Sequence, residues 1–115
     1  MAKDRIRRVN EAVREVLSQA ITTELKDPRV GFVTVTAVET SPDLRRARVF
    51  VSVLGDEPQR EESLAGLVSA HGYLQGRVAT ELRLKNTPQL DFVHDESADR
   101  VMRISELLRK GGETG

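Results

Sequence analysis

Residues 69–77 read SAHGYLQGR, and they lie inside a helical pattern that glycines interrupt. Apolar residues recur at helical spacings of three and four over Leu64, Leu67, Val68, Leu74, Val78 and Leu82. Gly66, Gly72 and Gly76 fall within this pattern, where each glycine costs about 1 kcal/mol relative to alanine. We therefore expect two packed helices that meet at a bend marked by Gly72, with Gly76 allowing close packing of helix on sheet. The Cβ added by Gly72→Ala should then destabilise the fold.

The region before this stretch predicts one helix followed by a hairpin. The helix ends before Asp27, since the residue preceding a proline avoids the helical region. Its apolar stripe consists of Ile6, Val9, Val13, Val16, Leu17, Ala20, Ile21 and Leu25. Residues 30–40 and 46–54 are rich in β-branched residues and are joined by the proline turn SPDLR. Their apolar faces are formed by Val33, Val35 and Ala37, and by Ala47, Val49, Val51 and Val53.

The region after the two helices predicts a short strand at residues 90–94 and a last helix that begins at Ser97. This helix places Val101, Ile104, Leu107 and Leu108 on one face. Because three strands cannot bury both faces of a sheet, the helices should cover one face and leave the other open. We expect an α+β protein of one domain over residues 1–110, with a flexible tail at residues 111–115.

Composition narrows the class of protein. The chain has 115 residues and no cysteine, which excludes disulfides and thiolate chemistry. No apolar run is long enough to span a bilayer, and the charged first residues do not resemble a signal peptide. The sequence thus predicts a soluble, cytoplasmic protein.

The charges balance overall but gather locally. Eighteen basic and eighteen acidic residues give no net charge, which argues against nucleic-acid binding through bulk charge. Bases cluster at residues 3–8, 45–48 and 77–85, and acids at residues 55–62 and 91–99. This pattern favours a bipolar surface, with scattered, solvated charge as the alternative.

No constellation of residues indicates catalysis, a cofactor or a metal. Zinc-ligand spacing, a phosphate-binding loop and a nucleophile elbow are all missing from the sequence. Asp95, Ser97, Asp99 and Glu106 match the ligand positions of a calcium loop. Arg100 occupies the position where that loop needs glycine, so we interpret Asp95 and Ser97 as helix caps. The sequence therefore does not predict an enzyme.

Nucleic-acid recognition by base stacking is also disfavoured. A stacking surface needs aromatic rings on the sheet. The alternation of apolar and polar residues in the predicted strands leaves Phe50 as the main candidate for such a ring. What remains is a bent pair of helices that approaches phosphates through its backbone and its flanking arginines.

The order α-β-β-α-α-β, with two tightly joined helices, resembles the type II KH fold, in which a G-x-x-G loop clamps the nucleic-acid backbone. Here Ala70-x-Gly72 stands in place of that loop. The chain resembles the ribosome-binding factor A family over residues 5–108. The resemblance is carried by this Ala-x-Gly kink and by the segments DPRVGFVTVT, SPDLRRARVFVS and LRLKNTPQLDFVHDESADRVMRISELL. The resemblance implies a single-domain, type II KH-like fold with a three-stranded sheet, an Ala-x-Gly kink and a C-terminal helix.

The resemblance also implies a function. The protein should bind free 30S ribosomal subunits and their precursors as a monomer, without catalysis. It should contact 16S rRNA near the 5′-terminal helix and support late 16S processing, 30S maturation and growth in the cold. The alternative is a protein–protein adaptor that uses the open face of the sheet.

The candidate rRNA-binding residues are Arg5, Arg7, Arg8, Arg46, Arg48, Ala70, His71, Gly72, Arg77, Arg83 and Lys85. The first three begin a helix, where positive charge opposes the helix dipole, so an external anion is a reasonable explanation for them. We interpret His71 as a solvent-facing residue at the bend. Reversing Arg77, Arg83 and Lys85 to Glu should weaken 30S binding while folding survives.

Overall fold

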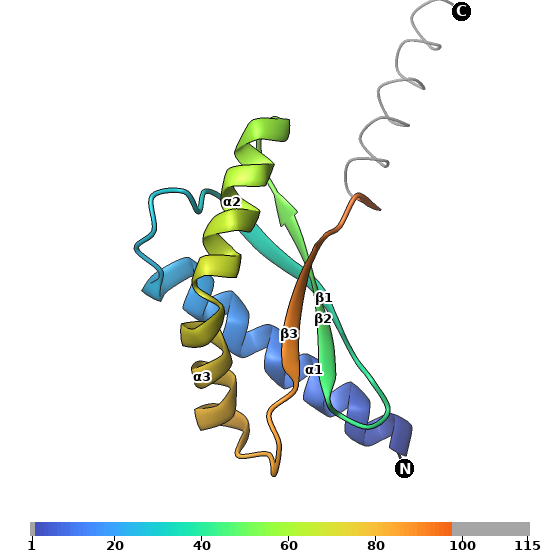
Figure 1. Cartoon of the computed structure of the whole chain (residues 1–115). Coiled ribbons are helices and arrows are strands. Elements are labelled where there is room, and N and C mark those ends of the chain that lie inside the picture. Colours follow the sequence, from blue (N-terminus) through green and yellow to red (C-terminus); the bar gives the residue numbers. More distant parts are fainter. Residues whose placement is uncertain (1, 98–115) are drawn as a thin grey trace, which may run out of the picture.

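The computed structural model describes residues 2–97 and confirms the predicted order of elements (Figure 1). In chain order these are α1 (Ala2–Gln19), the π-helical turn η1 (Ala20–Glu24), β1 (Val33–Thr40), β2 (Arg46–Val53), α2 (Glu57–Ser69), α3 (His71–Leu82) and β3 (Gln89–His94). Of the predicted last helix, only Ser97 lies within the described residues, and the predicted tail at residues 111–115 lies outside them.

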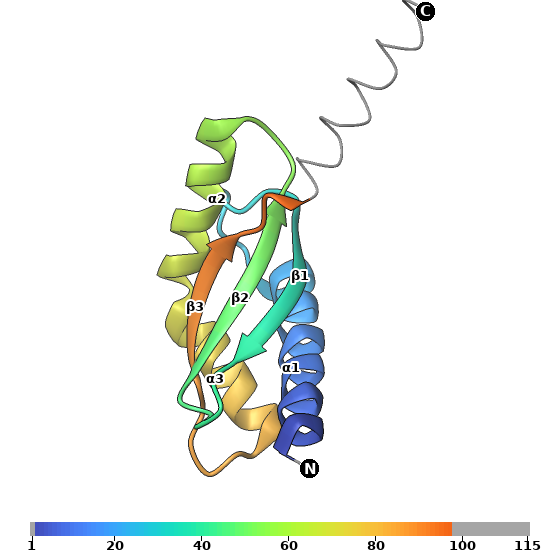
Figure 2. The same ribbon diagram turned by 90° about the vertical axis from the view of Figure 1, so that its right-hand side faces the viewer.

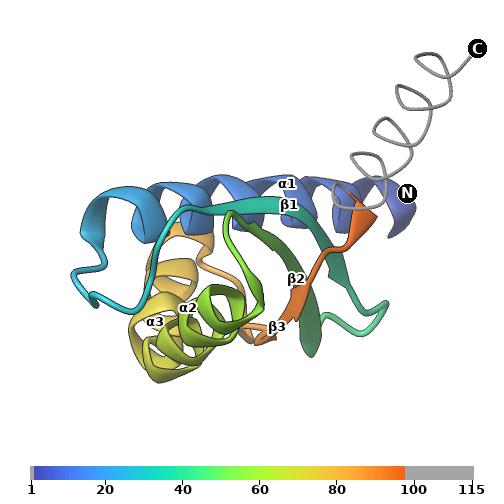
Figure 3. The same ribbon diagram turned by 90° about the horizontal axis from the view of Figure 1, so that it is seen from above.

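The sheet has the strand order β1-β2-β3, with β1 antiparallel and β3 parallel to β2. The parallel pairing requires a long crossover, which α2 and α3 provide. Figure 2 shows the described helices behind the sheet, whose other face is open toward the viewer. Seen from above, α1 runs alongside β1, and α2 and α3 lie together (Figure 3). The prediction of a sheet covered on one face is confirmed for the described residues.

The core lies between this sheet and the helices. Most of the stripe predicted for the first helix is buried, namely Val9, Val13, Leu17, Ala20 and Ile21. The apolar face predicted for β2 is also buried, as Ala47, Val49, Val51 and Val53. Val68 differs from the prediction, because α2 packs through Ser63, Gly66 and Leu67 and leaves Val68 63% exposed.

A β-bulge overturns the predicted alternation in β1. Val35 pairs with Val51, but Ala37 pairs with Phe50, so Thr36 is an extra residue in the strand. An extra residue shifts the alternation by one position. Ala37 is therefore exposed and Val38 is buried, the reverse of what strict alternation predicts.

The bulge also anchors the chain where it leaves β3. The Thr36 hydroxyl donates a hydrogen bond to Oδ2 of Asp95 at 2.6 Å, and the Ser97 backbone N–H donates to Oδ1 at 2.9 Å. These hydrogen bonds, that of Thr36 above all, lower the pKa of Asp95 to about 2. Asp95 is thus ionised at neutral pH and accepts a local hydrogen bond from Ser97, while the helix that it was predicted to cap lies outside the described residues.

The bend between the helices is confirmed, but its glycines do not have the predicted roles. α2 ends at Ser69 and α3 begins at His71, so Ala70, with φ −86° and ψ 8°, separates the helices. Gly72 has no positive φ. A Cβ at Gly72 or Gly76 would meet no other side chain or distant backbone within 4 Å. The prediction that the bend requires glycine at position 72 is therefore wrong, and so is the prediction that Gly76 allows close packing of helix on sheet.

Close packing occurs instead at Gly66, one turn before the bend at Ala70. A Cβ at this buried residue would lie 2.6 Å from Cγ2 of Val30, in the loop between η1 and β1. Valine has a stiff χ1 angle, so its methyl group cannot easily move away. Gly66 thus lets α2 pack against that loop.

Two glycine substitutions should therefore change stability in opposite directions. We expect Gly72→Ala to raise the free energy of unfolding by about 1 kcal/mol through helix propensity. Gly66→Ala should lower it by about 1–3 kcal/mol through overpacking. Denaturant unfolding of the two variants beside the wild type measures both changes. Destabilisation by Gly72→Ala, or stabilisation by Gly66→Ala, would contradict this assignment.

Candidate nucleic-acid interface

The predicted site residues fall on three separate surfaces of the molecule. We call them the bend cleft, the sheet hollow and the α1–α3 groove. The bend cleft lies between the helix junction and β3, and the sheet hollow lies on the open face of the sheet. The α1–α3 groove lies behind the sheet, where Figure 2 shows the end of α3 beside the first turns of α1.

The bend cleft has a volume of about 510 Å³ and is lined by Val68, His71, Gln89, Leu90, Asp91 and Phe92. Ala70 and Gly72 flank His71 in the chain. His71 is partly buried, and its Nε2 atom is buried without a hydrogen-bond partner in the described structure. The interpretation of His71 as a solvent-facing residue is therefore wrong. The lining contains an acid, Asp91, but neither arginine nor lysine.

Gln75 holds the β3 side of this cleft in place, a role that none of the predicted patterns indicates. Its amide Nε2 donates to the carbonyl oxygen of Pro88 at 2.5 Å, and its Oε1 accepts from the backbone N–H of Leu90 at 3.2 Å. The side chain thereby forms hydrogen bonds with backbone groups at the start of β3, as a neighbouring strand would. The only signal in the sequence is a polar residue one turn after His71, which also fits an exposed helix position.

The sheet hollow balances its basic residues with acidic ones. It has a volume of about 510 Å³ and is lined by Glu39, Thr40, Ser41, Arg46, Arg48 and Asp91. Nε and Nη2 of Arg46 donate to the two carboxylate oxygens of Asp91 at 3.0 and 3.1 Å. Arg48 lies opposite Glu39 in the register of β1 and β2. The hollow therefore holds little uncompensated positive charge.

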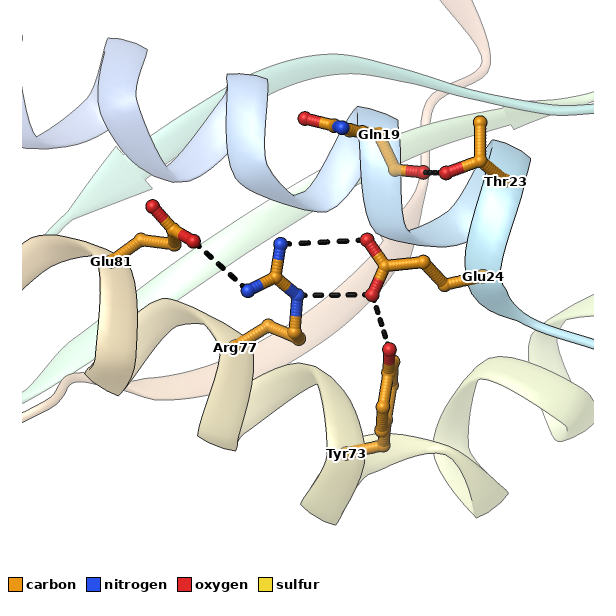
Figure 4. A network of polar contacts seen from close by, with 6 residues as sticks. All are labelled: Gln19, Thr23, Glu24, Tyr73, Arg77 and Glu81. Atoms are coloured by element: carbon orange, nitrogen blue, oxygen red, sulfur yellow. Dashed lines mark hydrogen bonds and ion pairs between the residues drawn. The ribbon is translucent and has the colours of Figure 1, made fainter.

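Arg77 belongs to a polar network between η1 and α3 (Figure 4). Its Nε lies 3.0 Å from Oε1 of Glu24, and its Nη1 lies 3.0 Å from Oε1 of Glu81. The Tyr73 hydroxyl donates to the same Glu24 carboxylate. This hydrogen bond contributes most to lowering the pKa of Glu24, and Arg77 lowers it further. The hydrogen bonds to Glu81 and Glu24 raise the pKa of Arg77.

Arg77 is consequently not a free cation. Reversing it to Glu would bring three carboxylates together where the structure has an ion-paired network. The prediction that the triple reversal leaves folding intact does not account for this network. A test of the basic surface should leave Arg77 unchanged.

The α1–α3 groove has a volume of about 520 Å³. It is lined by Arg5, Arg8, Val9, Ala12, Glu15, Val16, Glu81, Leu82 and Leu84. Arg83 and Lys85 are exposed and alternate with the two lining leucines. Arg7 is exposed on α1 but does not line the groove. The groove lining thus joins Arg5 and Arg8 to Leu82 and Leu84, the chain neighbours of Arg83 and Lys85, across more than seventy positions of the sequence.

Other kinds of site find little support in residues 2–97. That part of the chain contains no group of three or more His, Cys, Asp or Glu residues able to hold a metal ion. Within the same residues, every helix is too short or too polar to cross a membrane.

Comparison with known proteins identifies a family. The sequence model described as ribosome-binding factor A matches residues 5–108. The chain is 48% identical over 110 residues to ribosome-binding factor A of Brevibacillus brevis, covering 96% of this chain and 91% of that protein. It is 51% identical over 109 residues to that of Anaeromyxobacter sp. (strain K), covering 94% and 79% of the two chains.

Solved structures agree with this family. The crystal structure of ribosome-binding factor A from Thermus thermophilus superposes with a TM-score of 0.69 at 28% identity, covering 77% of this chain and 94% of that one. A homology model of the T. thermophilus protein, fitted into a cryo-EM map of a 30S–RbfA complex, gives a TM-score of 0.64 at 29% identity. This match covers 76% of the present chain and 91% of the fitted one. The KH-like α+β fold is therefore shared with this family.

Proposed function

The chain belongs to the ribosome-binding factor A family, and on this premise we propose that it binds free 30S ribosomal subunits and their precursors. The observation that carries this proposal is the match to the relative fitted into a 30S–RbfA map. The match covers three quarters of the present chain, including a common arrangement of helices and sheet. Binding to the same kind of particle is the simplest function for such a pair of relatives.

We propose that the protein acts by binding alone, as a monomer in the cytoplasm, and not as an enzyme. Support comes from the ion pairs of the described residues, which are structural, and from His71, which has no hydroxyl or thiol nucleophile among the residues that line its cleft. Exposed cations on a folded domain suit the positioning of an RNA backbone.

The bound particle would be a late precursor of the 30S subunit. We propose contact with 16S rRNA near its 5′-terminal helix, which would favour the conformation needed for final 16S processing and 30S maturation. In the cold, RNA helices rearrange more slowly and incorrect helices are more stable. We therefore expect such a factor to be most necessary at low temperature.

The sheet hollow favours a second candidate, a protein–protein adaptor. Its arginines are matched by Asp91 and Glu39, so this surface is polar without being strongly basic. A protein partner could bind such a balanced face, whereas RNA needs uncompensated cations. The dependence of binding on salt concentration separates the two, because release of counterions makes RNA affinity fall steeply with salt.

Removing the protein from cells should leave 16S rRNA with unprocessed 5′ ends and increase the fraction of free 30S particles. The effect should be larger at low temperature. Primer extension across the 5′ end of 16S rRNA and sedimentation of ribosomal particles measure the two changes. Re-expression of the wild-type chain is the control. Mature 5′ ends at both temperatures in the depleted cells would contradict the proposed role in processing.

A further inference from the structure

We infer that the α1–α3 groove, and not the bend cleft, holds the phosphate backbone of the rRNA that the proposed function requires. Arg5 and Arg8 would contact phosphates from α1, and Arg83 and Lys85 would do so from the segment after α3. The inference rests on the proposed function, because it identifies the surface through which the same RNA binds.

The charge distribution distinguishes this groove from the other two surfaces. The bend cleft has no arginine or lysine in its lining, and Arg46 of the sheet hollow is bound to Asp91. In the groove, Arg5 and Arg8 form no ion pair within the described structure. Of the two acids that line the groove, Glu81 is already bound to Arg77. Glu15 also lines the groove, so the excess of positive charge there comes from Arg83 and Lys85, which are exposed and adjoin the lining residues Leu82 and Leu84 in the chain.

Helix stability does not explain the position of Arg5 and Arg8. Arg5 lies at the end of the first turn of α1, where the helix dipole favours negative charge, and Arg8 lies one turn further on. They are three residues apart, so their side chains lie on one side of the helix and face the same groove. A bound phosphate would offset the unfavourable interaction with the dipole.

Arg83 also occupies a position that another residue would fill more easily. It follows the last residue of α3 in the left-handed conformation, with φ 50° and ψ 38°. Glycine is the usual residue at such a helix end, because a side chain is strained there. Positive charge suits the end of a helix, but Lys85 supplies charge nearby without the strain. An RNA contact explains why arginine stands at this position.

The floor of the groove suits the remainder of a nucleotide. Val9, Ala12, Val16, Leu82 and Leu84 give it an apolar surface between the basic residues. A ribose or the edge of a base can pack on such a surface while the rims hold phosphates. The volume of about 520 Å³ lies within the range of small-molecule sites.

The test compares two charge-matched double variants. Arg5→Gln/Arg8→Gln removes the groove cations from α1, and Arg14→Gln/Lys26→Gln removes two exposed cations that neither line the groove nor belong to the candidate residues. Affinity for purified free 30S particles is measured across a series of salt concentrations, with circular dichroism as the check on folding. We expect the groove variant to bind about ten-fold more weakly at low salt, with a salt slope lower by about two. The control variant should bind within about two-fold of the wild type.

A third variant, Arg83→Gly, separates RNA contact from stability. We expect it to weaken 30S binding and to lower the salt slope by about one, without lowering the denaturant midpoint of unfolding. His71→Ala in the bend cleft should leave the salt slope unchanged. A larger loss of slope in His71→Ala than in the groove variant would place the phosphate contact at the bend and overturn the inference.

The remaining outcomes are distinct. If the wild type does not bind 30S particles, the proposed function fails. If the wild type binds with a steep salt slope but the groove and control variants weaken equally, only the inference fails. Weaker binding of the groove variant with an unchanged salt slope would indicate a ribosomal protein at the groove, and would also overturn the inference.

Discussion

Leu74→Ala should lower the free energy of unfolding by about 2–5 kcal/mol, because it removes a fully buried side chain from the centre of the molecule. Leu74 lies in the first turn of α3, and its backbone N–H donates to the carbonyl oxygen of Ala70 at 3.0 Å. The side chain therefore fixes the helix that follows the bend against the core shared with α1 and the sheet. Denaturant unfolding with a common slope measures the loss.

Val68→Ala is the matched control. Both residues belong to the same apolar pattern in the sequence and lie on either side of the bend, but Val68 is 63% exposed. Its truncation should change the free energy of unfolding by less than about 0.5 kcal/mol. Similar losses in the two variants would contradict the burial of Leu74 and the exposure of Val68 on either side of the bend.

Local patterns were enough to predict the helices and strands of the described residues and most of the core, apart from the π-helical turn η1. The stripe through Val13 and Leu17 and the alternation in β2 depend on spacing alone, and both are confirmed. The bulge at Thr36 was not predictable in this way, because a strand with an extra residue has the same composition as a regular one.

The roles of the glycines depend on distant contacts. Propensity scales treat Gly66 and Gly72 alike, yet only Gly66 faces another segment closely, through Val30. That contact joins residues 36 positions apart, and nothing in the helical pattern indicates it. Gly72 stands in an open part of α3, so the Ala-x-Gly resemblance locates the bend while the backbone of Ala70 makes it.

At the candidate site, too, local features could be predicted from the sequence and distant contacts could not. The sequence identified basic clusters but not their long-range ion pairs, because Glu24 lies 53 positions from Arg77 and Asp91 lies 45 positions from Arg46. Nor could it place Arg5 and Arg8 beside Leu82 and Leu84, since that proximity follows from the packing of α1 against α3. Among the eleven candidates, the structure distinguishes the ion-paired Arg46 and Arg77 from Arg5 and Arg8, which line the groove and form no ion pair within the described residues.

Selective binding to the small ribosomal subunit is the other large effect expected. If four cations contact phosphates, affinity for 30S particles should fall about a hundred-fold between about 50 and about 200 mM salt. A protein without net charge has no general attraction to RNA, so binding should depend on the shape of the particle as well as on its charge. The 50S subunit offers as much phosphate and serves as the matched control.

Co-sedimentation of the purified full chain with separate free 30S, 50S and 70S particles is the decisive measurement of selective binding to the small subunit. We expect the protein to sediment with free 30S particles at low salt, to be released at high salt, and to stay in the supernatant with 50S and 70S particles. Equal sedimentation with 50S or 70S particles, or none with free 30S particles, would contradict this expectation.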